Sequence, residues 1–266
     1  MKKFIAILLT AALIFSFAAC GGKKDDTQDP ATTGVFTDEL QQEGKIIAAT
    51  SPDYAPYEYY DESNNMTGFD IEAFEEIVKI LNENEGTNLT VEWSEMDFST
   101  IISAVQVGQA DVGVSCFTYD PEREGQVLFT DYYLKSAQVA AVKADSDIKT
   151  LEDLKGKKLV AGNGTTGEKA ALEIEGAEVT CPGDYVVMFE VLKNGGTDAV
   201  VCDEAVGLNY QSTGEFKVLD EKLVDEEVSL ITNTKSTMLT EALNKAIAKF
   251  IESDKYTELK AKYGLN

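Results

Sequence analysis

The chain of 266 residues contains no histidine. Because imidazole is the usual acid–base group near neutral pH and a frequent metal ligand, this absence excludes Ser-His triads and most transition-metal sites. Basic residues are also scarce, with 23 Lys and Arg against 47 Asp and Glu and a formal net charge of −24. Nucleic-acid binding depends on Lys and Arg that neutralise phosphates, so nucleic acid is excluded as the expected partner. We expect no cofactor, no metal and no catalytic residue.

Cysteine is rare as well, and its 4 positions show no metal-type spacing. Cys181 and Cys202 each end an apolar run, as small core residues do. A disulfide between them is possible in an exported protein. A third expected strand separates them, however, and that distance exceeds disulfide geometry. The sequence therefore favours unpaired thiols, with the disulfide as the alternative.

Long apolar runs are missing except for a short one between positions 4 and 17. Lys2 and Lys3 precede this run, and small residues lead from it to Cys20. A membrane span needs roughly 20 apolar residues, so the run is too short, and the arrangement predicts a secretory signal peptide.

The ending Ala18-Ala-Cys-Gly21 resembles the bacterial lipobox, whose cysteine is acylated and becomes the new N-terminus. The resemblance implies a signal peptide over 1–19 and a lipid such as palmitate on Cys20; an ordinary signal peptide with an incidental cysteine is the alternative. Residues 20–35 are polar and predict a disordered tether. The protein would then be extracytoplasmic, anchored to the outer face of the cell membrane, or periplasmic if an outer membrane is present.

Strand and helix patterns alternate twice along the rest of the chain. Strands are expected at 45–50, 90–93, 111–114, 158–161, 178–180 and 199–201. Helices are expected at 70–81 with Asp70 as the cap, at 99–107, 168–175 and 188–193, and over 238–263, which we expect to pack on the first lobe. This alternation predicts an α/β fold with mostly parallel strands, and its repetition predicts two lobes.

Polar segments follow four of the expected strands. In open α/β sheets, ligands bind beyond the carboxyl ends of the strands. The segments are 51–57, 115–123, 162–167 and 202–204, and they offer aromatic rings, hydroxyls, one arginine, a glycine-rich turn and an acid. This inventory suits a small zwitterion. A nucleotide phosphate loop at 162–167 is a weak alternative, because the Lys-Ser/Thr ending is missing.

These segments also belong to a longer series of landmarks between Lys45 and the C-terminus. The landmarks are Tyr54–Tyr57, Gly68–Glu72, Met96–Ser99, Gln109–Asp111, Thr118–Arg123, Phe129–Tyr133, Asp153–Lys158, Gly164–Thr166 and Thr197–Val200. In this order they resemble the polar-amino-acid family of solute-binding proteins that serve ATP-driven importers.

The resemblance implies a type II periplasmic-binding-protein fold, in which two α/β lobes are joined by two hinge strands. Lobe 1 would comprise 36–136 and 229–266, and lobe 2 would comprise 137–228, with hinges near 135–137 and 228–230. It implies a monomer that closes around a free amino acid and delivers it to a membrane permease, rather than an enzyme. An extracytoplasmic amino-acid sensor and a dehydratase-like enzyme on the same fold are the alternatives.

The resemblance also implies which residues contact the ligand. The expected contacts are Tyr54, Phe98, Ser115, Thr118, Arg123, Thr166 and Asp203, with Ser51, Tyr57 and Gly164 as further candidates. Arg123 would bind the α-carboxylate through its rigid fork, supported by hydroxyl groups and the backbone N–H of Thr166. Asp203 would pair with the ammonium; Glu204 is the alternative but should point the other way along the strand. Tyr57 is assigned equally to the cleft and to the core.

Two positions bear on the ligand side chain. Ser51 stands where members that take cationic amino acids often carry an acid, which favours a neutral polar side chain, although Asp53 or Glu204 could supply charge. Gly167 stands where relatives often carry a larger polar residue, which predicts a roomier or less polar cleft.

Overall fold

A computed structural model of the chain describes residues 43–265. The predicted signal peptide, the acylation site Cys20 and the tether lie outside these residues. Within 43–265, no helix combines the length and the apolar character needed to cross a membrane.

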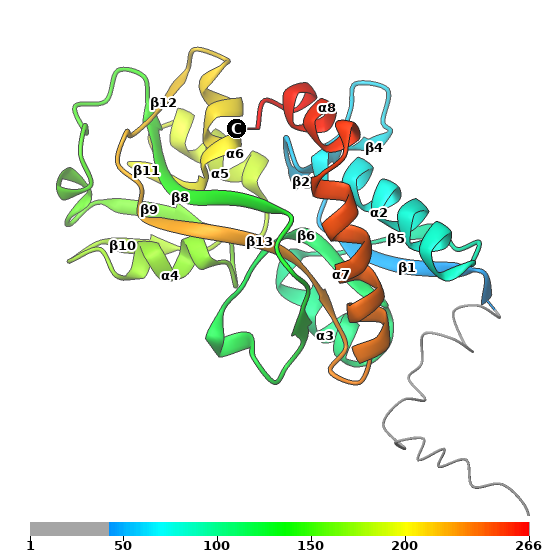
Figure 1. Ribbon diagram of the computed structural model, residues 1–266. Helices are drawn as coiled ribbons and strands as arrows, with labels where there is room; N and C mark the ends of the chain where they lie inside the picture. The colour runs from blue at the N-terminus through cyan, green and yellow to red at the C-terminus, as the bar shows by residue number, and fades with distance from the viewer. Residues whose placement is uncertain (1–42, 266) are drawn as a thin grey trace, which may run out of the picture. The chain divides into compact units, whose positions relative to one another are not determined.

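The architecture is built on one ten-stranded sheet (Figure 1). Its main path runs β10-β9-β11-β8-β13-β6-β1-β5, with β12 beside β8 and β7 beside β13. The strands are β1 (Lys45–Thr50), β5 (Thr90–Glu95), β6 (Val112–Thr118), β7 (Leu128–Phe129), β8 (Leu134–Lys143), β9 (Lys158–Ala161), β10 (Glu178–Thr180), β11 (Ala199–Asp203), β12 (Phe216–Val218) and β13 (Val224–Thr232). A small antiparallel sheet holds β2 (Asp53–Tyr54), β3 (Glu58–Tyr60) and β4 (Met66–Thr67).

Parallel pairing occurs in two separate groups of strands, as predicted. β1 pairs with β5 and β6, and β9 pairs with β10 and β11. The long strands β8 and β13 run antiparallel to each other between the two groups. The predicted hinge positions 135–137 and 228–230 fall within these two strands, while the lobe boundaries stay predictions.

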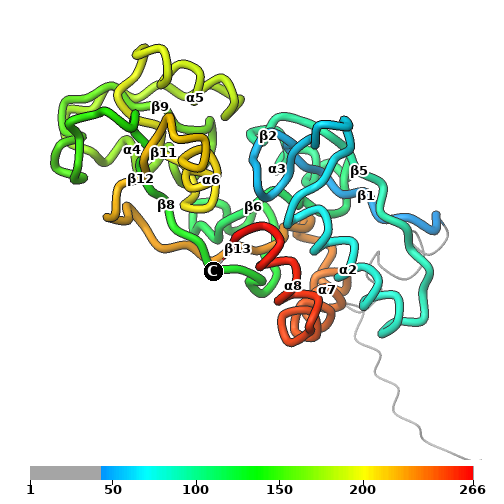
Figure 2. The backbone as a smooth tube through the Cα atoms, turned by 90° about the horizontal axis from the view of Figure 1, so that it is seen from above, coloured from blue at the N-terminus to red at the C-terminus, as the bar shows by residue number. Residues whose placement is uncertain are grey.

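Helices cover each group of strands (Figure 2). They are α2 (Phe69–Glu85), α3 (Phe98–Gln106), α4 (Thr166–Leu172), α5 (Tyr185–Lys193), α6 (Glu204–Gln211), α7 (Thr237–Ile251) and α8 (Asp254–Lys262), with 3-10 turns η1 (Pro121–Arg123) and η2 (Glu152–Leu154). The C-terminal stretch is thus two helices rather than one, because Ser253 accepts the N–H of Tyr256 and starts α8 anew. Both helices pack on α2 of the first lobe, as predicted.

The start of α2 differs from the prediction. Gly68, with φ 135°, is the N-cap, and a Cβ there would lie 2.0 Å from the carbonyl oxygen of Tyr57, so only glycine fits. Asp70 lies inside the first turn and is buried. Its carboxylate accepts the N–H of Cys116 and the hydroxyl of Tyr133, both at 2.8 Å. Asp70 therefore ties the helix to the sheet instead of capping it.

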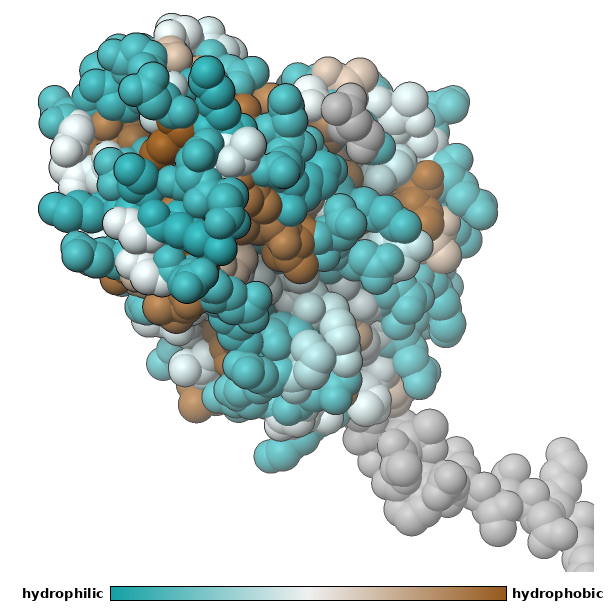
Figure 3. Space-filling model, turned by 90° about the vertical axis from the view of Figure 1, so that its left-hand side faces the viewer, coloured by the Kyte–Doolittle hydropathy of each residue, from teal (hydrophilic) through white to brown (hydrophobic). Residues whose placement is uncertain are grey.

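The cysteine prediction is confirmed for the described residues. Cys116, Cys181 and Cys202 are all free thiols. β9 lies between β10, which Cys181 follows, and β11, which contains Cys202. Polar side chains cover most of the face in Figure 3, in keeping with the acidic composition.

Candidate functional site

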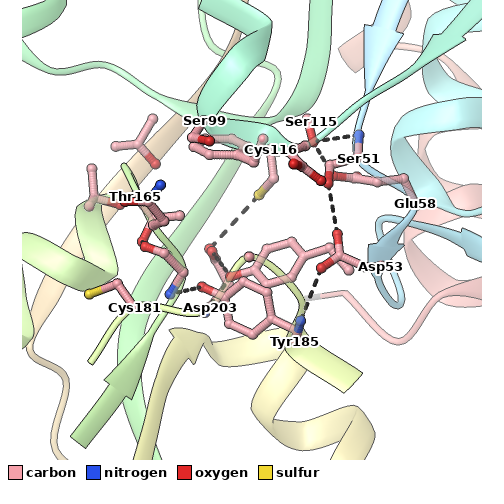
Figure 4. A pocket seen from close by; sticks show the side chains of 18 of the residues that line it. Ser51, Asp53, Glu58, Ser99, Ser115, Cys116, Thr165, Cys181, Tyr185 and Asp203 are labelled. Carbon is pink, nitrogen blue, oxygen red and sulfur yellow. Dashed lines mark hydrogen bonds between the residues drawn. The ribbon is translucent and has the colours of Figure 1, made fainter. Parts of the chain in front are cut away.

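The four segments that follow strands β1, β6, β9 and β11 meet around one cavity of about 260 Å³. The carboxyl ends of parallel strands share an edge of a sheet, which is why segments distant in sequence converge here. The lining residues are Ser51, Asp53, Tyr54, Glu58, Asp97, Phe98, Ser99, Ser115, Cys116, Thr118, Arg123, Gln138, Gly162, Asn163, Thr165, Thr166, Cys181, Gly183, Tyr185 and Asp203. Figure 4 draws 18 of them around the open space and labels ten.

Every residue that we expected to contact the ligand lines this cavity, as does Ser51. Tyr57 does not: it is 1% exposed in the core, with its hydroxyl 3.3 Å from Ser136 Oγ. The structure therefore favours the core alternative for Tyr57 over the ligand contact. Gly164 does not line the cavity either, but its carbonyl oxygen accepts a hydrogen bond from Arg123.

Arg123 ends the turn η1, which Pro121 and the cap residue Asp120 begin. Its guanidinium is buried and donates to the carbonyl oxygens of Thr118 at 3.1 Å and Gly164 at 2.9 Å. The rings of Phe98 and Phe117 lie within 6 Å of it. Burial lowers the pKa of this group, and nearby Asp120 and Glu226 oppose the shift. The result is a fixed cationic fork at the cavity wall, which can hold a carboxylate.

Asp203 ends β11 and is 4% exposed. Its carboxylate accepts the hydroxyls of Tyr54 and Ser136 and an N–H of Gln138. Burial raises its pKa, and these three donors oppose the shift. A buried carboxylate with only neutral donors lacks a cation, so it can pair with an entering ammonium group.

Glu204, the alternative to Asp203, is excluded from the cavity. It begins α6 and pairs with Lys222 at 3.0 Å on the surface. Glu204 thus lies outside the cavity as expected, but because it begins a helix and not because side chains alternate along a strand.

The glycine-rich turn leads into α4, which begins at Thr166. The preceding Thr165 caps it, since its hydroxyl accepts the N–H of Glu168 at 3.1 Å and donates to the carbonyl of Gly162 at 2.7 Å. Thr166 therefore stands at the positive end of the helix beside the cavity.

The expected room around Gly167 does not exist. A Cβ on Gly167 would lie 2.6 Å from Oε1 of Gln138, whose side chain fills that space. The roomier cleft was therefore a wrong prediction, because a residue from β8 replaces the missing side chain.

Tyr185 completes an aromatic wall that the sequence reasoning missed. Its ring centroid lies 4.5 Å from that of Tyr54, and its backbone N–H donates to Asp53 at 3.0 Å (Figure 4). Tyr185 follows strand β10, so the same rule of strand ends could have found it.

Three further carboxyl groups lie around the cavity, and of these the sequence indicates only Asp53, as a possible source of charge. Glu58, directly after the Tyr54–Tyr57 landmark, is fully buried and accepts the hydroxyl of Ser115 at 2.6 Å. Its other oxygen has no partner among the described residues, and burial followed by the charge of Asp70 raises its pKa well above the usual value. Asp53, which accepts the Ser51 hydroxyl at 2.9 Å, and Asp97 also line the space. Apart from Arg123, no lining residue is basic.

Acidic side chains also gather behind the wall. Burial raises the pKa of Asp70 to about 6, and burial with the charge of Asp203 raises the pKa of Glu226 on β13 to about 7. Within residues 43–265, no group of three or more acids and cysteines is arranged to hold a metal ion.

Comparison with known proteins agrees with this arrangement. The family model of bacterial extracellular solute-binding proteins, family 3, matches residues 46–266. An arginine-binding extracellular protein of Bacillus subtilis is 29% identical over 270 residues, which cover 99% of this chain and 98% of the relative.

Solved structures show the same fold. An ancestral arginine-binding protein bound to arginine is similar with a TM-score of 0.77 and 32% identity, covering 83% of this chain and 98% of that one. An ancestral amino-acid-binding protein, a precursor of cyclohexadienyl dehydratase, gives a TM-score of 0.77 at 29% identity, covering 85% and 98%. The predicted two-lobed periplasmic-binding-protein fold is thereby confirmed, and the chain belongs to the bacterial extracellular solute-binding proteins of family 3.

Proposed function

We propose that this protein captures a free amino acid in the cavity and delivers it to the permease of an ATP-driven importer. One observation carries the proposal: a buried arginine fork that follows β6 and a buried aspartate at the end of β11 line the same cavity of about 260 Å³. Arg123 would bind the α-carboxylate and Asp203 the α-ammonium. A ligand that touches both lobes stabilises their closed arrangement, which a permease can recognise.

The side chain of the ligand is a finer proposal. Ser51 supports the neutral polar side chain expected from the sequence, because the position carries no charge. A cationic side chain is the second candidate, and the acids Asp53, Glu58 and Asp97 favour it, since they line the cavity and Arg123 is the one basic residue in its lining. Similarity to arginine-binding proteins points the same way. Of the two, the charges of the cavity support the cationic side chain better.

We expect one or a few amino acids to raise the thermal midpoint of the purified protein on the order of 10 °C. A ligand at a thousand times its Kd adds about 4 kcal/mol to stability, and each kcal/mol is worth about 2–4 °C at this size. The measurement is a thermal-shift panel of the twenty amino acids and common α-keto acids on protein refolded to remove carried-over ligand.

The panel also separates the candidates. Shifts with arginine, lysine or histidine alone establish the cationic side chain; shifts with glutamine, asparagine or serine alone establish the neutral one. A shift with α-keto acids but no amino acid would favour an enzyme of the dehydratase kind. No shift with any of these compounds contradicts amino-acid capture and favours another ligand class.

The anchor is part of the same proposal. The protein would act as a monomer held outside the cell membrane by acyl chains on Cys20. We expect Cys20→Ser to move the protein from the membrane fraction to the soluble fraction of cells. Unchanged membrane association would contradict the lipid anchor and leave amino-acid capture untouched.

A further inference from the structure

Gln138 joins two buried acids that come from different strands. It lies on β8, is 2% exposed and lines the cavity. Its amide nitrogen donates to Asp203 Oδ2 at 3.0 Å and to Glu226 Oε2 at 2.8 Å. A carboxamide has two N–H donors and one acceptor oxygen, so two ionised neighbours permit only one orientation of the group. The carboxylates of Asp203 and Glu226 thereby set the orientation of the Gln138 amide, and the amide in turn restrains the Asp203 carboxylate.

Gly167 leaves the space that this arrangement needs. Oε1 of Gln138 lies 2.6 Å from the position of a Cβ on Gly167, so a larger residue there would collide with it. The same oxygen has no hydrogen-bond partner among residues 43–265. Gln138 and Gly167 therefore form a complementary pair, in which the side chain from strand β8 occupies the space that glycine leaves open on helix α4.

Asp203, Gln138 and Glu226 form a hydrogen-bonded bridge, and Glu226 is the member at its outer end. It is 4% exposed, and its strand β13 crosses between the two lobes. The charge of Asp203 acts on it through space, and Arg123 interacts with it electrostatically. The hydroxyls of Thr118 and Thr166 also face it. Further charged groups lie along the grooves on its outer side: Asp120, Lys135, Lys169, Glu204, Lys222, Asp225 and Glu227.

We propose that Gln138 and Glu226 are positioning residues for recognition of the ligand's ammonium group. Ionised Glu226 holds the Gln138 carboxamide in one orientation, and that carboxamide holds the Asp203 carboxylate toward the cavity. The inference rests on the proposed function, since Asp203 is its point of contact with the ligand. Protonation of Glu226 turns an acceptor into a donor, which frees the amide to rotate and loosens Asp203.

Calorimetric titration with arginine and glutamine tests the bridge. We expect Gln138→Ala and Glu226→Gln to weaken binding roughly 10- to 100-fold, as for loss of a hydrogen bond to a charged group. In the wild type the affinity should fall as the pH drops from about 8 to about 6, because Glu226, with a pKa of about 7, takes up a proton. Glu226→Gln should lack most of this pH dependence.

A double substitution supplies the matched control. Gly167→Gln alone should weaken binding because it collides with Gln138. Gln138→Ala combined with Gly167→Gln moves the carboxamide from the strand to the helix, and it should bind more tightly than either single variant. Strictly additive losses in this cycle would overturn the pairing of these positions.

The unliganded protein gives a readout that does not depend on the ligand. The folded-state pKa of Glu226 is raised, so the folded state binds more protons than the unfolded state between about pH 4 and about pH 7. The thermal midpoint should therefore rise as the pH falls through about 7, and Glu226→Gln should flatten that rise. As the pH falls, the affinity for the ligand should therefore decrease while the thermal midpoint of the unliganded protein increases. A general loss of stability cannot produce this combination.

The outcomes separate the two proposals. If neither amino acid binds but the stability profile depends on Glu226, the proposed function or the choice of ligand fails while the bridge stands. Wild-type affinity in both single variants, with unchanged pH profiles, would overturn the inference.

Discussion

Arg123→Ala should weaken amino-acid binding by a factor of about 1,000. Truncating one partner of a buried, hydrogen-bonded charge pair costs roughly 2–5 kcal/mol, because the other charge is left without compensation. Here the uncompensated charge would be the α-carboxylate of the ligand, in a cavity whose lining contains no basic residue besides Arg123. Isothermal titration calorimetry measures the loss directly.

Arg123→Lys is the matched control for geometry. It keeps the positive charge but loses the planar fork, so we expect an affinity between those of the wild type and the alanine variant. Because Arg123 also donates to the carbonyls of Thr118 and Gly164, the thermal midpoint of each unliganded variant must be measured as well. Undiminished affinity in a folded Arg123→Ala protein would place the carboxylate elsewhere.

Asp203→Asn should have two large effects of opposite sign. Binding should weaken on the order of 100-fold or more, because the neutral amide cannot pair with the ammonium. The unliganded protein should become more stable, because the substitution removes a buried charge that lies near Glu226 and Asp70. Binding by calorimetry and the thermal midpoint without ligand are the two measurements.

The predicted gain in stability of Asp203→Asn should depend on pH, and the direction of this dependence can be checked. Asp203 has a raised pKa in the folded state, so its destabilising charge is fully present above that pKa and disappears as the pH falls. The gain in stability from Asp203→Asn should therefore be largest in mildly alkaline solution and shrink toward acid. A lower midpoint in the variant at all pH values would show that the hydrogen bonds of Asp203 outweigh the cost of its charge.

Much of the fold could be predicted from the sequence because buried parallel strands are short apolar runs between helical patterns. β1, β9 and β10 begin and end where the pattern predicts. The cap of α2 was missed because Asp70 is a common N-cap residue, whereas its real partners, Cys116 and Tyr133, are distant in sequence. Only the tertiary fold brings them together.

The residues of the candidate site also fall into a group that the sequence predicts and a group that it does not. Residues after strands could be predicted, since topology alone brings them to one edge. Gln138 offered a weak signal, as a polar side chain beside the apolar residues that follow it in β8. Glu226 offered the opposite signal, because the acids Asp225 and Glu227 beside it suggest an exposed segment while its own side chain is buried. Burial of a single face in a crossing strand depends on the partner strand, which the local sequence does not identify.

The strands that cross between the lobes also position Asp203: Ser136 and Gln138 on β8 donate hydrogen bonds to it, and Glu226 on β13 accepts one from Gln138. The same short segments of the chain therefore contain both the hinge positions and the residues that position Asp203. Under the proposed function, a substitution in these strands would change both the opening of the lobes and the affinity for the ligand. Divergence of such a protein toward a new nutrient would then alter its rate of release in the same evolutionary step.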